Sequence, residues 1–111
     1  MIPIKTKVLR FSYNWNKKLN CNCFTTLRLA GSWQEGDTVS VVLKDGSIYK
    51  ELGEAYIIGV KTFYCNSINE YIARLDTGYS AAKCKEIIRR MYKKDNPLMD
   101  LLLVQYVKKV E

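Results

Sequence analysis

Residues 37–49, Asp-Thr-Val-Ser-Val-Val-Leu-Lys-Asp-Gly-Ser-Ile-Tyr, carry the pattern that decides the fold. The valine-rich segment 38–43 is typical of a β-strand, because β-branched side chains pack well on a pleated surface. Asp45-Gly46 then predicts a two-residue type I′ turn, in which both central residues take a positive φ. A returning strand from Ser47 completes an antiparallel hairpin.

Alternating apolar and polar residues extend the sheet on both sides of this hairpin. They predict further strands at 5–11, 24–29, 55–64 and 101–107. Gly59 lies inside the third of these, which makes it a candidate for a β-bulge.

Three helices are expected between the strands. Ser12 and Asn14 can cap a short helix over residues 13–19, and asparagines at 20 and 22 can end it in a left-handed backbone. Ser67-Ile68-Asn69-Glu70 has the form of a capping box and predicts a second helix to about residue 75, which Asp76-Thr77-Gly78 would stop. Ser80 caps a third helix to about residue 94. Its apolar stripe consists of Cys84, Ile87, Ile88, Met91 and Tyr92.

The predicted order is β-α-β-β-β-β-α-α-β. With 111 residues the chain has the size of one domain, 1–111. We expect an α+β fold with a small closed or half-closed β-barrel of five to six strands and two or three flanking helices.

Charge is distributed unevenly along the chain, whose formal net charge is +7. Residues 1–34 contain six basic residues and no acidic one, and residues 83–111 contain eight basic and four acidic residues. Between them, 35–82 contain four basic and seven acidic residues. Basic ends predict a positive face, which attracts polyanions such as nucleic acid. Solubilising lysine is the alternative explanation.

Composition also excludes several classes of site. The absence of histidine removes histidine-based catalytic triads and His-containing metal sites. Cys21-x-Cys23 could be half of a zinc site, but Cys65 and Cys84 are far apart in sequence, so free thiols and no metal or cofactor are expected. No apolar run is long enough to span a bilayer, and no secretory signal precedes the domain, so we expect a cytoplasmic protein.

The segment around residues 21–37 resembles the ASCH family, whose members have a PUA-like barrel. The family pattern is Gly-x-Lys-x-x-Thr-x-Arg, of which Thr26 and Arg28 match the last two positions. Gly36-Asp37 matches the turn into the next barrel strand, and Leu75-Asp76-x-Gly78-Tyr79-Ser80 is similar to the acidic turn between the family's late helices. The order of elements over nearly the whole chain carries most of the resemblance.

The resemblance implies either RNA binding or hydrolysis. Family members that act as amidohydrolases on acetylated cytidine use a lysine as base, a threonine as nucleophile and an acidic residue. Here Cys21 and Cys23 stand at the glycine and lysine positions. A threonine without an adjacent base is a poor nucleophile, and Cys23 has no visible activating partner. The sequence therefore favours a binding module over an enzyme.

The predicted function is RNA or nucleotide binding in a cleft near Thr26 and Arg28. Arg28 offers a planar fork of donors for phosphate or a base edge, and tryptophans and Tyr13 could stack unpaired bases. The alternative for Arg28 is a bracing ion pair with Asp76 or Asp37, and tryptophans are more often core residues. The candidate binding residues are Lys17, Lys18, Thr26, Arg28, Trp33 and Asp76.

Two further functions stay open. The first is a hydrolase, an amidohydrolase or nuclease acting on modified nucleosides or RNA, with Thr26, Lys17 or Lys18, and Asp76 as its catalytic groups. The second is a protein-interaction module that uses the basic helix 83–94 against an acidic partner. The sequence does not indicate an oligomeric state.

Overall fold

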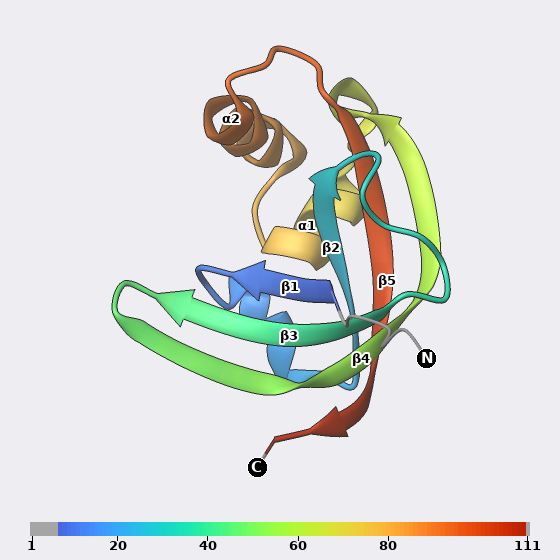
Figure 1. Cartoon of the computed structure of the whole chain (residues 1–111). Coiled ribbons are helices and arrows are strands. Elements are labelled where there is room, and N and C mark those ends of the chain that lie inside the picture. The colour runs from blue at the N-terminus through green and yellow to red at the C-terminus, as the bar shows by residue number, and fades with distance from the viewer. Residues whose placement is uncertain (1–6, 111) are drawn as a thin grey trace.

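The hairpin at Gly46 forms the long, projecting part of the sheet in the computed structural model, which describes residues 7–110 (Figure 1). In it β3 (Thr38–Asp45) pairs antiparallel with β4 (Ile48–Tyr64), and Asp45 lies opposite Ile48. The loop is therefore Gly46-Ser47, one residue later than predicted. Of these two residues only Gly46 has a positive φ, 61°. A type II′ turn fits this backbone better than the predicted type I′, because type II′ places the glycine first.

The sheet has five strands in the order β1-β3-β4-β5-β2. β1 (Lys7–Phe11) is parallel to β3, whereas the β3–β4, β4–β5 and β2–β5 pairs are antiparallel. β2 spans Cys23–Leu29 and β5 spans Leu98–Lys109. The first two residues of the predicted 5–11 strand lie outside the described part of the chain.

β4 is one continuous strand where the sequence predicted two. The pairing of β4 with β5 continues through two register shifts, one between Glu54 and Ala55 and one between Ile57 and Gly59. The second shift confirms the predicted bulge at Gly59. Gly53 lies where β4 bends, with φ +151°, and a Cβ there would stand 2.2 Å from the carbonyl oxygen of Lys108 on β5. Glycine therefore lets β5 approach the bend without ending the strand.

The expected barrel is not confirmed, although the α+β class is. β1 and β2 are the two edge strands, and within residues 7–110 no hydrogen-bonded ladder joins them, so the sheet is curved but open. The chain between these strands forms the 3₁₀ helix η1 (Trp15–Asn20), which contacts β2 and α1. Its Leu19 is buried in the core beside Phe24. η1 thus packs against one of the two edge strands, β2, and ties it to α1.

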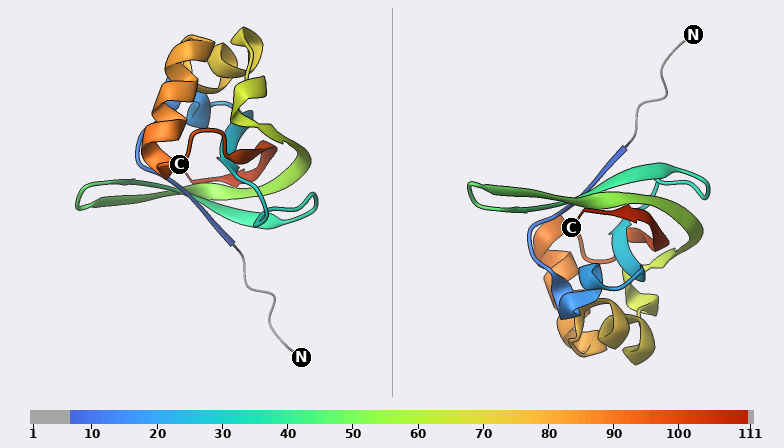
Figure 2. Two further views of the ribbon diagram at one scale, coloured as in Figure 1. Left: turned by 90° about the horizontal axis from the view of Figure 1, so that it is seen from above. Right: turned by 90° about the horizontal axis from the view of Figure 1, so that it is seen from below.

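The helices pack on the same side of the projecting hairpin, as both views in Figure 2 show. They are α1 (Glu70–Thr77), α2 (Ala81–Tyr92) and the short 3₁₀ helices η1 and η2 (Cys65–Ser67). The predicted capping box at Ser67 is wrong: the Asn69 side chain accepts the Ile72 N–H and caps α1.

The ends of α1 and α2 lie within two residues of the predicted ones, whereas the predicted side-chain cap at the start of η1 does not form at Asn14. Gly78 ends α1 in a left-handed backbone with φ 82°, and Ser80 caps α2 by accepting the Lys83 N–H, both as predicted. The left-handed backbone expected at residues 20–22 occurs earlier, at Asn16 and Lys17, each with φ 54°.

Two buried clusters meet beside β2. One fills the concave face of the sheet and includes Phe11 and Phe24, and the other lies between the sheet and the helices and includes Cys84 and Ile88. Because side chains of β2 alternate between its two faces, this edge strand contributes to both clusters. The candidate site lies at this junction.

Candidate nucleotide-binding cavity

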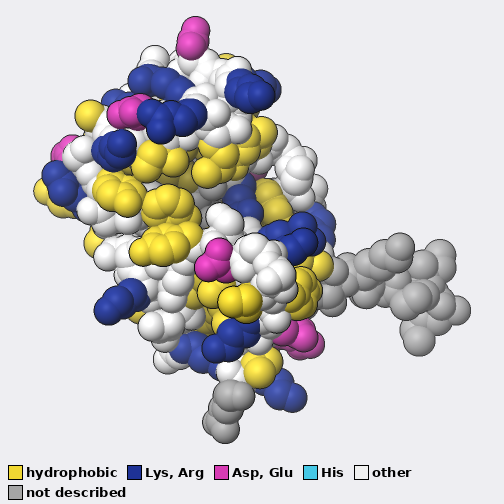
Figure 3. All heavy atoms as spheres, turned by 90° about the vertical axis from the view of Figure 1, so that its left-hand side faces the viewer, with side chains coloured by type: hydrophobic (Ala, Val, Ile, Leu, Met, Phe, Trp, Pro, Cys, Tyr) yellow, Lys and Arg dark blue, Asp and Glu magenta, His cyan; other side chains and the backbone are white. Residues whose placement is uncertain are grey.

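A cavity of about 130 Å³ opens between α2 and the chain segments around β1 and β2. Its α2 wall is largely apolar and includes Ile87, Ile88 and Met91, while its opposite wall carries Lys18, Arg28 and other polar groups. Figure 3 views the molecule from this side and shows hydrophobic side chains around a hollow, with Lys and Arg side chains above and below it. An apolar cavity with a few convergent polar groups is the usual form of a small-ligand site.

Lys18 and Asp76 form a buried ion pair in the cavity wall. Lys18 Nζ lies 3.1 Å from Asp76 Oδ1, and the two residues are only 6% and 3% exposed. The pair joins η1 to the end of α1, two elements separated by about half of the chain. It therefore fixes the polar wall of the cavity in place.

Thr25 adds a second donor to the same carboxylate. Its Oγ1 donates to Asp76 Oδ1 at 2.9 Å, whereas none of the hydrogen bonds found within residues 7–110 uses Asp76 Oδ2. No fully buried side-chain oxygen or nitrogen in that range lacks a partner, so Oδ2 has some access to solvent. Asp76 lines the cavity, so its carboxylate can accept a hydrogen bond from a ligand there.

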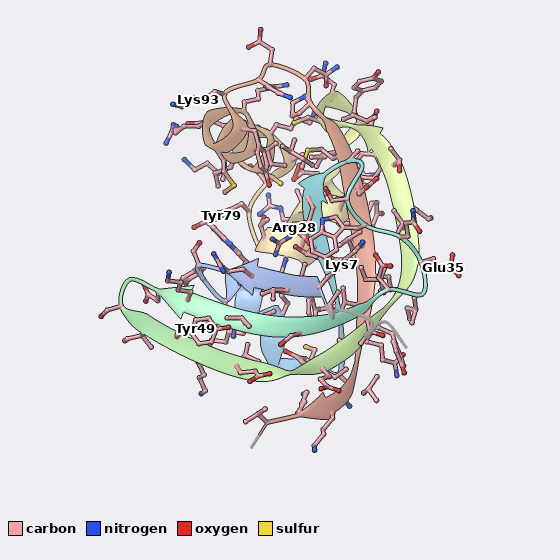
Figure 4. The ribbon with its side chains drawn as sticks, in the orientation of Figure 1. Lys7, Arg28, Glu35, Tyr49, Tyr79 and Lys93 are labelled. Carbon is pink, nitrogen blue, oxygen red and sulfur yellow. The ribbon has the colours of Figure 1, made fainter. Side chains whose placement is uncertain are left out.

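Arg28 is the second cation of the wall, and no carboxylate among residues 7–110 forms an ion pair with it. Its Nε donates to Thr26 Oγ1 at 3.2 Å, and its guanidinium carbon lies 4.5 Å from the centre of the Phe11 ring. None of the ion pairs in residues 7–110 includes Arg28. Figure 4 places it between α2 and β1, facing the open side of the molecule. Its remaining N–H groups are therefore available to a ligand.

Burial controls the ionisation of these groups. It lowers the pKa of Lys18, although contact with Asp76 opposes the shift. Burial likewise raises the pKa of Asp76 against the stabilising effect of Lys18 and the Thr25 hydrogen bond. The pKa of Arg28 is lowered for the same reason, but arginine stays protonated in proteins. With one carboxylate between two cations, the polar wall has a net positive charge and favours an anionic ligand.

Cys84 completes the wall as an unreactive thiol. Burial and the nearby Asp76 carboxylate raise its pKa to about 11, so it is protonated at neutral pH. Cys65 is also buried, while Cys21 and Cys23 are exposed. Within residues 7–110 no three Cys, Asp or Glu side chains are grouped closely enough to hold a metal ion.

The structure brings together four of the six candidate residues. Lys18, Thr26, Arg28 and Asp76 line the cavity, with Thr26 only 3% exposed. Lys17 is exposed and does not line it, although its neighbour Lys18 does. Trp33 belongs to a different hollow beside Asp100, where Lys7 Nζ lies 5.7 Å from its ring centre. Lys17 and Trp33, two of the predicted binding residues, therefore do not line the cavity.

The ion pairs that the sequence suggested for Arg28 do not form among the described residues. Asp76 pairs with Lys18, and Asp37 pairs with Lys7 at 2.7 Å. The hydrogen bond from Lys7 holds the pKa of Asp37 below its usual value.

Sequence reasoning missed Thr25, Phe11 and Tyr79. Strand alternation indicates that Thr25 faces away from Thr26. It does not indicate that the Asp76 carboxylate of α1 lies on the Thr25 side. The alternating pattern places Phe11 in a strand, but it does not indicate that the Phe11 ring packs against the Arg28 guanidinium. Tyr79 stands next to the helix cap Ser80, and only the fold brings its ring to within 5.8 Å of the Trp15 ring.

Comparison with known proteins does not assign a family. Neither models of protein families nor curated proteins nor solved structures give a match to this chain. In the part of the chain that the structure describes, no helix is long and apolar enough to cross a membrane. The chemistry of the cavity is therefore the basis for a functional proposal.

Proposed function

We propose that the protein is a nucleotide- or RNA-binding module that captures its ligand in the cavity beside Arg28. One observation carries the proposal: a half-buried guanidinium faces a cavity and has a hydroxyl, not a carboxylate, as its hydrogen-bond partner. Removing a charge from water without pairing it is costly, so such a group is retained where an anion from outside supplies the partner. A phosphate or a base edge matches its planar donors.

The other walls of the cavity suit the remainder of a nucleotide. Apolar side chains of α2 and the ring of Trp15 can cover the face of a base. Asp76 Oδ2 can accept a hydrogen bond, and Thr26 can donate its hydroxyl proton, so the polar wall offers both kinds of partner to a base edge. The overall charge of +7 adds a non-specific attraction for polyanions.

We further propose that the chain is a divergent member of the ASCH family and that its curved sheet corresponds to a PUA-like barrel. The order of strands and helices and the positions of Thr26 and Arg28 support this assignment. Cys23 stands at the strand position where the family has a lysine, and in this chain the lysine that lines the cavity is Lys18 of η1.

Fluorescence anisotropy with labelled single-stranded RNA pentamers tests the proposal. The wild type and Arg28→Gln are titrated at about 50 and 200 mM salt, a range over which phosphate contacts weaken strongly. Loss of a charged hydrogen bond worth about 1.5–3 kcal/mol should weaken binding by about 10- to 150-fold. Arg74→Gln is the matched control, because Arg74 is exposed on α1 and pairs with Glu70. Equal binding by the two variants, or binding insensitive to salt, would contradict the proposal.

A hydrolase acting on modified nucleosides is the second candidate. Lys18, Thr26 and Asp76, the three residue types that the family resemblance implies, line one cavity. However, Lys18 bonds to Asp76 and Thr26 bonds to Arg28, and within residues 7–110 no hydrogen bond joins Lys18 to Thr26. The base would have to leave its carboxylate before it could take the hydroxyl proton. This arrangement of hydrogen bonds favours ligand binding over hydrolysis.

Incubation with acylated nucleosides distinguishes the two candidates. Chromatography would measure release of the free nucleoside by the wild type, by Thr26→Ala and by Thr38→Ala, a control on β3 outside the cavity lining. Turnover that Thr26→Ala alone abolishes would establish the hydrolase. Binding without turnover by the wild type would leave the binding module as the function.

A further inference from the structure

Three aromatic side chains stand at the edge of the cavity and form a group that we call the aromatic rim: Tyr13, Trp15 and Tyr79. The Tyr13 and Trp15 rings are 5.0 Å apart at 74°, and the Trp15 and Tyr79 rings are 5.8 Å apart at 70°. Trp15 also lines the cavity. Both contacts are edge-to-face, the geometry that aromatic quadrupoles favour, so the rim is held in a defined arrangement.

The rim is exposed although it is assembled from distant parts of the chain. Tyr13 is 59% and Tyr79 is 42% exposed. Two of its members flank the start of η1, while Tyr79 belongs to the turn between α1 and α2. Figure 4 shows Tyr79, like Arg28, toward the open side of the molecule. Aromatic rings that cluster without being buried are suited to covering the face of a ligand.

The cavity itself is too small for more than one ring system. Its volume of about 130 Å³ lies below the range of about 300–1,000 Å³ that is usual for pockets of drug-sized ligands. Any longer nucleic acid must therefore leave most of its chain outside, across the rim. A base held in a duplex is stacked and paired and does not reach such a cavity.

Basic residues of α2 lie along the same side of the molecule. Lys83 and Arg90 of α2 share Glu86, whereas Lys93 and Lys94, which directly follow the helix, take part in none of the ion pairs found in residues 7–110. Figure 3 shows Lys and Arg side chains above and below the hollow, and Figure 4 places Lys93 at the end of α2. They can neutralise the phosphates that flank an inserted nucleotide.

We infer that the aromatic rim is a stacking subsite for the base adjacent to the one in the cavity. The ligand is then a single-stranded nucleic acid of at least two nucleotides, not a free nucleotide and not a duplex. The inference rests on the proposed function of the cavity but adds a second contact outside it. Stacking on exposed aromatic rings tolerates any base, so the rim contributes affinity while the cavity selects the nucleotide.

Binding measurements on ligands of different length test the rim separately from the cavity. Calorimetry would measure nucleoside monophosphates, and anisotropy would measure labelled RNA pentamers, DNA pentamers and an RNA duplex. Tyr79→Ala should weaken pentamer binding about 5- to 150-fold, the range for one stacked base, and leave monophosphate binding unchanged. Tyr79→Phe should bind as the wild type does. Tyr71→Ala is the control, because Tyr71 is 80% exposed on α1 and joins none of the rim's ring pairs.

The possible results separate the two proposals. If Tyr79→Ala binds pentamers as well as Tyr71→Ala does, or if the duplex binds as tightly as the pentamers, the rim inference is overturned while the cavity proposal stands. If Tyr79→Ala loses monophosphates equally, Tyr79 belongs to the cavity and the second subsite is also overturned. If the wild type binds neither monophosphates nor pentamers, both proposals fail. The comparison of RNA with DNA identifies which polymer supplies the stacked base.

Discussion

Replacing the Lys18–Asp76 pair tests how the cavity wall is stabilised. Asp76→Leu removes the partner of a lysine that is 6% exposed and lies beside Arg28, so two cations remain without an anion. Lys18→Met leaves the Asp76 carboxylate with only the Thr25 hydroxyl. Breaking a buried pair on one side typically costs about 3–5 kcal/mol.

This cost is large for a protein of 111 residues. Total stability at this size is about 5–15 kcal/mol, and each kcal/mol changes the melting temperature by about 4 °C or more. Each single variant should therefore melt about 12–20 °C lower than the wild type. The double variant Lys18→Met with Asp76→Leu removes both charges and fills the space with apolar atoms. It should be as stable as the wild type or more stable, because the cost of removing two charges from water disappears.

The direction of the pKa changes gives the pH dependence of this difference. Burial raises the native pKa of Asp76 above its usual 3.8. The free energy of unfolding of the wild type therefore decreases as the pH rises from 3.8 to the native pKa and the carboxyl ionises. Burial lowers the native pKa of Lys18 below its usual 10.5, so the wild type also loses free energy of unfolding as the pH falls from there and the amine is protonated. The advantage of the double variant should therefore be greatest near neutral pH.

Chemical denaturation of the four proteins at several pH values measures the effect. The expected result is a coupling energy of several kcal/mol between the two substitutions, since each is costly only while the other charge remains. Single variants that unfold at the wild-type denaturant concentration, or effects that add without coupling, would show that the pair is not a desolvated unit and would refute the reasoning.

Two further predictions concern the backbone. Gly53→Ala places a Cβ 2.2 Å from the Lys108 carbonyl oxygen in a strained φ and should cost about 1–3 kcal/mol by thermal unfolding; Gly59→Ala, whose Cβ meets only ordinary contacts, should change stability by less than about 1 kcal/mol. An equal effect of the two would contradict the close approach at the strand bend. Asn69→Ala should lower the free energy of unfolding by about 0.5–2 kcal/mol, because Asn69 caps α1. Ser67→Ala should change it by less than about 0.5 kcal/mol. A larger loss for Ser67→Ala than for Asn69→Ala would show that Ser67 caps the helix.

Local signals in the sequence predicted most of the elements. The hairpin, the bulge at Gly59 and the Ser80 cap depend on residues close together in the chain, and all three form. The capping box failed because two capping residues lie two positions apart, and the local pattern does not choose between Ser67 and Asn69. The Glu70 carboxylate instead accepts the Ala81 N–H at 3.0 Å, which links the two helices.

The parts that depend on long-range contacts were harder to predict. Whether the sheet closes depends on whether the edge strands β1 and β2 pair, which the local pattern of either strand does not specify. The different positions of Lys17 and Lys18 depend on which side of η1 packs against β2 and α1, a long-range contact that the local sequence does not specify. Arg28 was a candidate from its residue type, but its lack of a carboxylate partner follows only from where Asp37 and Asp76 lie in the fold.

The most direct test of the central claim observes the Arg28 side chain while a ligand binds. In a nitrogen-labelled sample, the Arg28 Nε–H resonance is followed by NMR during titration with nucleoside monophosphates, together with the amide resonances of Ile87 and Met91 in the opposite cavity wall. The account predicts that these signals shift together and saturate, and that Arg28→Gln abolishes the shifts of Ile87 and Met91. Shifts confined to other parts of the protein, or unchanged cavity signals at saturating ligand, would contradict it.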